Sequence, residues 1–475
     1  MNEIRRILDL PATPERVWAY LTEPEKISAW LMDCNLIPTS GTQFTFTAPA
    51  AGRWDGHIHC EVMDVIPHER ISYTWTANDI GATTLVTFDL EPTPTGTRLL
   101  LVHRGLENAR GGAPGRHSAG WYRCLKALAA VFTAEPALYD WSELQLTWHV
   151  DAPLGDVYEL WSTAAGMQRF WGDLVEAKDD QGRSRPASEE YANGDRIRIR
   201  FPTGTETALQ ILNLEHERFL LFSFGDDYGW VNVRFETAGQ RTRIVLRHFG
   251  LQTGDALSWH LQANARGWWI LNLLNIQSVL LHNHDLRIRQ PGCEGCLGTL
   301  FNPGSEPRAD YHDWSSFDTY LYIDATPQEV QAAWRCATGL CSFFISEMTL
   351  RDRSGAVLPG DHFATGDQYH WQWIHPFELT GEFLDVSDTA MTFSFGGNYR
   401  VSISVTAAAT GSLLHLHQDG LSNDDNGRVH GSLNCRSCWI YYLVNLKSVL
   451  ETGNDLRDRD PETADAISVS YNLIH

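Results

Sequence analysis

The sequence has no run of about 20 consecutive apolar residues, which is the length that a membrane-spanning helix requires. Its N-terminus carries Arg5 and Arg6 but neither an apolar stretch nor a small-residue cleavage site, so it does not read as a secretory signal peptide. Cysteine is scarce, at 9 of 475 residues. We therefore expect a cytoplasmic protein without a membrane span, in which the cysteines are mostly reduced.

Basic residues are also in deficit, with 37 Lys and Arg against 59 Asp and Glu and a formal net charge of −22. Such a charge repels phosphate backbones and anionic lipid surfaces, which argues against nucleic acid as a partner. A hydrophobic content of 43% with 20% charged residues is ordinary for a folded protein. The length exceeds what one hydrophobic core usually serves and favours about three domains.

Sequence motifs of common enzyme classes are missing. The chain contains no phosphate-binding GxxxxGK[ST], no GxGxxG after a strand, no HExxH and no GxSxG. Two CxxC pairs occur, at Cys293 with Cys296 and at Cys435 with Cys438, but they lie much farther apart than the pairs of a zinc ribbon. We predict no metal, no cofactor and no catalytic residue, and the role of the two cysteine pairs stays open.

What the sequence does contain is one segment written repeatedly. "WILNLLNIQSVLLHNHDLR" begins at Trp269, "WIYYLVNLKSVLETGNDLR" begins at Trp439, and a shorter version, "WYRCLKALAAVF", begins at Trp121. Apolar residues recur 4, 7 and 11 positions after each Trp, which places them on one face of a helix. They are Leu125, Leu128 and Phe132, then Leu273, Ile276 and Leu280, then Leu443, Leu446 and Leu450.

The ends of these helices share a second feature. Asp285 with Arg287, and Asp455 with Arg457, stand in the same "DLR" after the second and third helices, and we expect each to close its helix with a salt bridge or a cap.

Each helix closes a longer repeated unit. The units open with "ILDLPATPERVWAYL", "TWHVDAPLGDVYELW" and "LYIDATPQEVQAAW", which read as a strand entering a helix. Thr326, Pro327 and Glu329 predict a capping box in the third unit, and Thr13 with Pro14 predict a simpler N-cap in the first. Alternating segments such as "RIRIRF" then predict an antiparallel sheet.

The repeat predicts three domains, at residues 1–137, 142–288 and 313–457. Between the second and third lies a Gly- and Pro-rich linker, 289–312, and the tail 458–475 could add one edge strand.

The ordered motifs resemble the helix-grip, START-like superfamily often labelled SRPBCC. Within it they are most similar to the domain shared by activators of the 90-kilodalton heat-shock protein's ATPase. The first unit matches best, through "ATPERVWAYLTEPEKISAWL", "IPHERISYTW", "VTFDLEPTPTGTRLLLVHRGL" and "GWYRCLKALAAVF", whereas the third lacks the "ER" turn and has Cys438 before its Trp. The resemblance implies an α+β fold of three tandem helix-grip domains, each a curved antiparallel sheet wrapped around a long C-terminal helix.

A bent sheet cannot lie flush along a straight helix, so a gap lined by apolar side chains remains between them as a site for an apolar small molecule. We expect an enclosed apolar cavity in at least the first two units. The alternative is that the same side chains simply fill the core. The expected lining residues are Trp30, Phe44, Phe46, Trp75, Trp121 and Leu125; Phe170, Trp171, Phe224, Trp269 and Leu273; and Phe343, Phe344, Trp371, Trp373 and Trp439.

A shared turn ends a late strand in each unit, and the residue two positions before its Gly is His103, His248 or Gln418. The histidines could donate a hydrogen bond to a ligand, or they could be satisfied structural histidines. The glutamine argues against a catalytic role common to all three units. Gly120, just before Trp121, is expected to let the helix approach the sheet.

Three functions follow from the resemblance. The first is binding of a hydrophobic small molecule, lipid-, sterol- or polyketide-like, in a cavity. The second is a protein-interaction role in the stress response, with stimulation of a heat-shock chaperone ATPase. The third, less favoured, is a cavity-based enzyme of the cyclase or hydrolase kind. Convergent polar groups inside the cavity would favour chemistry, whereas a dry apolar lining would favour binding.

Overall fold

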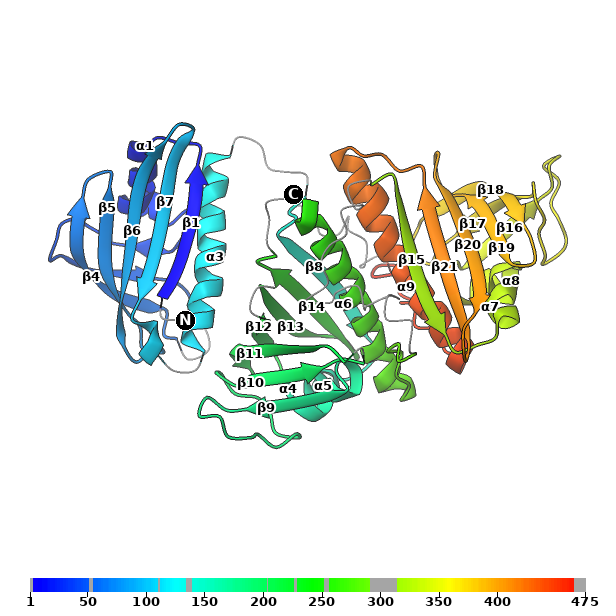
Figure 1. The fold of residues 1–475 in the computed structure, drawn as a ribbon, viewed down its shortest axis with the longest axis horizontal. Helices are drawn as coiled ribbons and strands as arrows, with labels where there is room; N and C mark the ends of the chain where they lie inside the picture. Colours follow the sequence, from blue (N-terminus) through cyan, green and yellow to red (C-terminus); the bar gives the residue numbers. More distant parts are fainter. Residues whose placement is uncertain are drawn as a thin grey trace. The chain divides into compact units, whose positions relative to one another are not determined.

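A computed structural model describes residues 3–50, 54–109, 112–133, 139–202, 204–225, 229–251, 256–290 and 314–464. They contain three seven-stranded antiparallel sheets, each with a pair of short helices and one long helix (Figure 1). Each sheet has the same strand order: the first strand pairs with the last, and the others follow backwards along the chain. The α+β prediction of three tandem helix-grip domains is therefore confirmed, and each sheet with its helices is called a domain below.

The first domain forms a curled half-barrel with the strand order β1-β7-β6-β5-β4-β3-β2. Its strands are β1 (Glu3–Leu10), β2 (Asp33–Cys34), β3 (Gln43–Thr47), β4 (His57–Ile66), β5 (Arg70–Thr76), β6 (Thr83–Thr93) and β7 (Gly96–Arg104). Its helices are α1 (Pro14–Thr22), α2 (Pro24–Ile27) and α3 (Ala113–Phe132).

The other two domains repeat this plan. The strands of the second are β8 (Glu143–Val150), β9 (Leu174–Lys178), β10 (Arg196–Arg200), β11 (Glu206–Glu215), β12 (Phe219–Phe224), β13 (Trp230–Ala238) and β14 (Arg241–Phe249), and its helices are α4 (Leu154–Ser162), α5 (Ala164–Phe170) and α6 (Ala256–His282). The strands of the third are β15 (Ser316–Ile323), β16 (Glu347–Arg351), β17 (Gln368–Gln372), β18 (Glu378–Val386), β19 (Ala390–Ser394), β20 (Arg400–Ala407) and β21 (Ser412–Asp419), and its helices are α7 (Pro327–Trp334), α8 (Ala337–Phe343) and α9 (Cys435–Thr452), the last preceded by a π-helix (Gly427–Asn434).

By its internal contacts the chain divides into two compact units. One contains residues 1–137, 176–197 and 208–232, and the other contains 138–175, 198–207 and 233–475. The two long helices α6 and α9 therefore belong to the same unit.

The predicted helix starts are confirmed in one case and wrong in part in the other. Thr326 and Glu329 form the reciprocal capping box at α7, with Pro327 at the first helical position. Thr13 does occupy the N-cap of α1, but its side chain makes no capping hydrogen bond. The pKa of the Glu15 carboxylate is lowered, chiefly by a backbone hydrogen bond at Glu15 and less by Thr13.

The predicted apolar faces of the long helices are confirmed, because the residues 4 and 7 positions after each Trp are buried in every domain. In α6 burial goes further, and from Gln262 to Val279 only Asn264 is partly exposed. A helix that is buried all round must be covered on two sides. The sheet of its own domain covers one side, and α9 covers the other (Figure 1).

Polar and apolar contacts hold α6 against α9. Arg266 is completely buried and donates from Nε to Ser437 Oγ at 3.1 Å, while Arg436 Nη2 donates to Asn264 Oδ1 at 2.9 Å. A Cβ atom on Gly267 would lie 2.6 Å from Ile440 Cδ1. The two helices therefore lie close together at Gly267, where a larger residue would require the terminal methyl of Ile440 to shift.

At the end of each of these helices, the Asp and Arg of the "NDLR" or "HDLR" ending form a hydrogen-bonded cluster with an Asn of the helix. We call this cluster the clasp. In the third domain, Asn445 Nδ2 donates to the carbonyl of Phe343 (2.9 Å) and to Asp455 (2.9 Å), and its Oδ1 accepts from Leu456 N (2.6 Å). Arg457 pairs with Asp455 at 2.7 Å and donates to two carbonyls at the end of α8. The expected salt bridge is confirmed, and it fastens the long helix to the short one.

The second domain repeats the clasp through Asn275, Asp285 and Arg287. At the matching place in the first domain stands Ala127, so this position supplies no carboxamide there. The clasp explains why the two later helices resemble each other more than either resembles α3.

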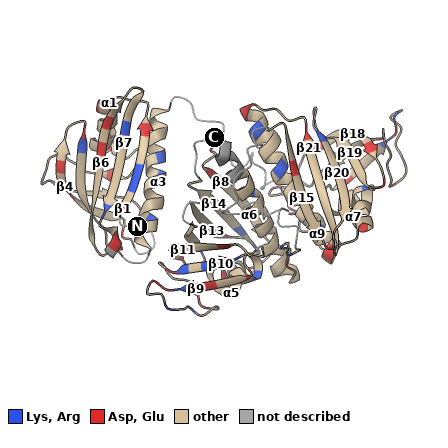
Figure 2. Ribbon diagram, viewed as in Figure 1, with Lys and Arg blue, Asp and Glu red and all other residues tan. Residues whose placement is uncertain are grey.

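Acidic and basic residues are intermingled along the strands (Figure 2). Across β1 and β7, Arg98 pairs with Asp9 and Arg104 pairs with Glu3, both at 2.8 Å and both in direct register. Such exposed pairs add only about 0–1 kcal/mol each. They contribute more to the register of the two strands than to the stability of the sheet.

Two predicted segments lie largely outside the described residues. Most of the linker 289–312, with Cys293 and Cys296, is among them, as is the tail from residue 465 onward. The described part of the tail, 458–464, contains turns and no strand. Among the described helices, none is long and apolar enough to cross a membrane.

Candidate functional site

A chain of buried hydrogen bonds links α3 of the first domain to its sheet. Trp121 Nε1 donates to His103 Nδ1 at 3.0 Å, and His103 Nε2 lies 2.7 Å from Thr84 Oγ1, which donates to the carbonyl of Trp75 at 3.0 Å. Because Nδ1 accepts, the proton of the neutral imidazole sits on Nε2. Both ring nitrogens are therefore committed within the protein, and His103 is a satisfied structural histidine that does not donate to a ligand.

The same link recurs in the other domains. Trp269 Nε1 donates to His248 Nδ1 at 3.2 Å, and Trp439 Nε1 donates to Gln418 Oε1 at 2.7 Å. In all three, the residue two places before the turn glycine accepts from the Trp of the long helix. What the three units share at this place is a hydrogen-bond acceptor, which is why glutamine can replace histidine.

Beside this chain the first domain contains a cavity of ≈160 Å³. It opens between β5 and α3, and its lining is mostly apolar. The lining residues are Leu31, Met32, Trp75, Arg116, His117, Gly120, Trp121 and Cys124. We expected an enclosed apolar cavity in at least the first two domains; in the first domain the cavity is apolar and partly open to solvent.

Gly120 has a different role from the one predicted. A Cβ atom added to it would meet no atom within 4 Å, so the helix does not need a glycine here to approach the sheet. The missing side chain instead leaves open space at the cavity wall. In the middle of a helix, glycine costs about 0.5–1 kcal/mol relative to alanine.

Of the predicted lining residues in the first domain, Trp75 and Trp121 line the cavity. Trp30, Phe44, Phe46 and Leu125 lie in the surrounding hydrophobic core instead, because their side chains pack among one another and the sheet. The sequence analysis missed His117, Gly120 and Cys124 as lining residues. Their spacing along α3, together with Trp121, places them on one helix face, and that pattern was the available signal.

In the second domain, aromatic rings occupy the corresponding place. Trp268 takes the position of Gly120, and its ring centre lies 4.7 Å from that of Trp269, 5.6 Å from Trp171 and 5.8 Å from Phe201. The indole occupies the place that Gly120 leaves without a side chain, and the expectation of an enclosed cavity in the second domain stays a prediction. The remaining predicted residues, Phe170, Phe224, Trp269 and Leu273, are buried in the core.

The third domain is packed in a similar way. Phe344 stacks on Trp439 with ring centres 5.0 Å apart, and it also contacts Trp371, Trp373 and Tyr442 at 5.0–5.4 Å. Phe343 packs against Trp334 at 4.9 Å. The predicted aromatic residues do meet around the head of the long helix, and they meet as a core.

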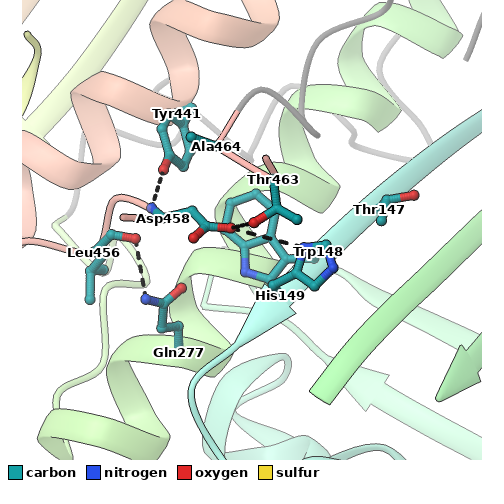
Figure 3. Close-up of a pocket in the computed structure, with 9 residues that line it drawn as sticks. All are labelled: Thr147, Trp148, His149, Gln277, Tyr441, Leu456, Asp458, Thr463 and Ala464. Carbon is teal, nitrogen blue, oxygen red and sulfur yellow. Dashed lines mark hydrogen bonds and ion pairs between the residues drawn. The ribbon is translucent and has the colours of Figure 1, made fainter. Parts of the chain in front are cut away.

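A smaller cavity of ≈20 Å³ lies where β8, α6 and α9 meet (Figure 3). Polar groups converge on it: Gln277 Nε2 donates to the carbonyl of Leu456, Tyr441 Oη accepts from Asp458 N, and Thr463 donates to the Asp458 carboxylate. A space of this size holds about one water molecule. It is a polar seam within the second unit and is too small for an organic ligand.

Burial controls the titratable groups near the large cavity. Desolvation, with a smaller contribution from His117, lowers the pKa of His103 to about 3. Desolvation also lowers the pKa of His117 and raises that of the Cys124 thiol to about 11. At neutral pH the wall therefore presents the uncharged imidazole of His117 and the protonated thiol of Cys124.

Burial also raises one thiol pKa in the cysteine pair of α9. Neither Cys435 nor Cys438 is in a disulfide, and burial raises the pKa of Cys435 to about 11. Among the described residues, no group of three or more His, Cys, Asp or Glu side chains is placed to hold a metal ion.

Residues 11–133 match the family described as activator of Hsp90 ATPase homolog 1-like protein. The first domain belongs to this family. The match covers the α1–α3 region, including the cavity, and the second and third sheets repeat the strand order of the first.

Several solved structures are similar to parts of this chain. Protein MLL2253 from Mesorhizobium loti is 32% identical over 27% of this chain and 95% of its own, with a TM-score of 0.25. The Aha1 dimer from Colwellia psychrerythraea is 17% identical over 28% of this chain and 98% of its own, also with a TM-score of 0.25. DynU16, a protein of the dynemicin biosynthetic locus, is 19% identical over 58% of this chain and 97% of its own, with a TM-score of 0.25. No curated protein matches the chain.

Proposed function

We propose that the first domain binds a small apolar molecule in the cavity between β5 and α3. The observation that carries the proposal is the ≈160 Å³ of space beside Gly120 and Trp121, in a wall made mostly of apolar side chains. The cavity is partly open to solvent, and Gly120 in its wall is exposed, so an apolar ligand there would remove apolar surface from water. An apolar ligand would recover the contacts that the wall lacks.

The volume sets the size of the ligand. A cavity of about 150 Å³ lined by apolar side chains takes up benzene, whereas drug-sized ligands need about 300–1,000 Å³. The first domain therefore suits a molecule with a single ring better than the sterol or polyketide expected from the resemblance. Such a small molecule buries little area, and we expect a Kd on the order of 0.1–1 mM.

The groups around the cavity favour binding over catalysis. A thiol with a raised pKa is a poor nucleophile, because the thiolate is the reactive form. His103 has both ring nitrogens committed, and the charge of Arg116 is balanced by Asp79 at 3.0 Å.

We expect Gly120→Trp to abolish binding of a probe such as toluene, measured by calorimetric titration or ligand-observed NMR. The second domain already carries Trp268 at this position, so the substitution copies an arrangement that this fold accommodates. The loss should be at least tenfold, because the indole takes the space of the ligand.

The matched control for this experiment is Ala127→Trp, which adds the same side chain to an exposed position of α3. Toluene should bind this control as it binds the wild type. Equal binding by Gly120→Trp, or no binding of toluene by the wild type, would contradict the proposal.

The family match supports a second candidate, stimulation of the ATPase of a 90-kilodalton heat-shock protein. The test is to add the purified chain to that chaperone and to follow ATP hydrolysis. A rise in the rate that Gly120→Trp retains would assign this activity to the surface of the protein rather than to the cavity. An unchanged rate with the wild-type chain would exclude this candidate.

A further inference from the structure

On the basis of the proposed function, we further propose that the cavity ligand is aromatic, and that the thioether of Met32 helps the cavity to distinguish an aromatic ring from a saturated one. Among the described residues that line the cavity, Leu31 is the only one with an aliphatic hydrocarbon side chain. The other apolar groups of the wall are indole rings and sulfur atoms, which interact with an aromatic ring in ways that a saturated ring does not share.

Two indole rings form the buried part of the wall. Trp75 lies on β5 and Trp121 on α3, their ring centres are 5.2 Å apart, and their planes are inclined by 52°. Their side chains are only 4% and 3% exposed. The N–H of Trp75 is buried and that of Trp121 donates to His103, so a ligand meets ring carbon. Aromatic rings attract one another in edge-to-face and offset arrangements, beyond the effect of the area that they bury.

Two sulfur-containing side chains line the more accessible part of the cavity. Met32 and Cys124 are half-buried and pack against the hydrophobic core of the first domain. A thioether is polarizable and makes favourable contacts with the edge of an aromatic ring. Burial raises the pKa of Cys124 to about 11, so its sulfur is an uncharged thiol at neutral pH. Both sulfurs thus offer polarizable, uncharged contacts.

These groups separate two rings of the same size. A saturated ring would gain only from the removal of apolar surface from water. An aromatic ring would gain from this removal and also from its contacts with indole and sulfur. A negatively charged substituent would need a free cation, and Arg116 in the lining is already paired with Asp79 at 3.0 Å. The wall therefore favours an uncharged aromatic ring.

The test compares toluene with methylcyclohexane, which has the same carbon skeleton but no π electrons. Binding to the full chain is measured by the loss of each probe from the vapour above the solution, and uptake that Gly120→Trp abolishes is assigned to the cavity. Each affinity is divided by the partition coefficient of the probe between hexadecane and water, which removes the difference in hydrophobicity. We expect the corrected affinity for toluene to be roughly 3–10-fold higher. Equal corrected affinities would overturn the inference, whereas binding of neither probe would mean that the proposed function fails.

A second comparison tests the sulfur itself. Met32→Leu keeps the volume and the apolar character of the side chain but removes the thioether. It should reduce the corrected preference for toluene by roughly 2–5-fold. The matched control is Met63→Leu, at a methionine of β4 that is 49% exposed and does not line the cavity, and it should leave the preference unchanged. A preference that survives Met32→Leu in full would refute the role of this sulfur.

Discussion

His103 should cost the first domain about 2 kcal/mol of stability between pH 7 and pH 5, and replacing it with glutamine should abolish this loss. In the folded domain His103 is completely buried, and Trp121 donates to its Nδ1. Protonating that nitrogen would turn an acceptor into a donor facing another donor. Burial already lowers its pKa to about 3, against about 6.5 in the unfolded chain.

The sign follows from which state binds the proton. Between about pH 6.5 and pH 3 the unfolded chain takes up a proton at His103 that the folded domain does not. The stability is therefore fully present above the unfolded pKa and declines as the pH falls through this window. Glutamine has no such titration, and Gln418 shows that its oxygen can accept from the helix tryptophan at 2.7 Å.

The measurement is hydrogen exchange in increasing urea, read by mass spectrometry on peptides of residues 1–137. Comparing wild type and His103→Gln at the same pH cancels the intrinsic exchange rates, so the difference gives the change in opening free energy. The matched control is His57→Gln, at an exposed histidine of the same sheet. Equal acid sensitivity of wild type and His103→Gln would refute the prediction.

A second large effect is expected from Asn445→Ala, at about 3 kcal/mol of lost stability in the third domain. The carboxamide is completely buried and joins three elements: the end of α8 through Phe343, the helix α9, and the chain after it through Leu456. Alanine would leave a buried N–H and a buried carbonyl unpaired, and each costs about 1–3 kcal/mol.

This loss can be measured by urea denaturation and localised by hydrogen exchange over residues 435–457. Asn398→Ala, in an exposed turn of the same domain, should change stability by less than about 0.5 kcal/mol. A comparably small effect of Asn445→Ala would mean that the clasp is only a consequence of the fold. Asn275→Ala offers an independent repeat of the test in the second domain.

Sequence reasoning succeeded for features that depend on local pattern. The three helices that contain Trp121, Trp269 and Trp439 follow from apolar spacing, although they begin earlier in the chain than these tryptophans, at Ala113, Ala256 and Cys435. The capping box at Thr326 follows from a short motif. The order of elements along each unit, from strand to short helices to antiparallel strands to long helix, followed from the repeated motifs. These features are recoverable because each depends on neighbours in the chain or on one fold shared by all three units.

Sequence reasoning was less successful where the role of one side chain depends on the position of another. His103 reads as a possible ligand contact in sequence, and only the positions of Trp121 and Thr84 show that both its nitrogens are used. Gly120 reads as a contact point between helix and sheet, and only the empty space around it shows that it opens a cavity.

The amino-acid sequence by itself determined that this protein contains one sheet-and-helix unit three times, because helical and strand periodicity are local properties of the chain. The tertiary structure alone decided where the cavity of the first unit lies and how α6 pairs with α9. Both depend on the volume and hydrogen bonds of side chains far apart in the sequence: Gly120 leaves open space beside α3, whereas its counterpart Trp268 packs against other aromatic rings.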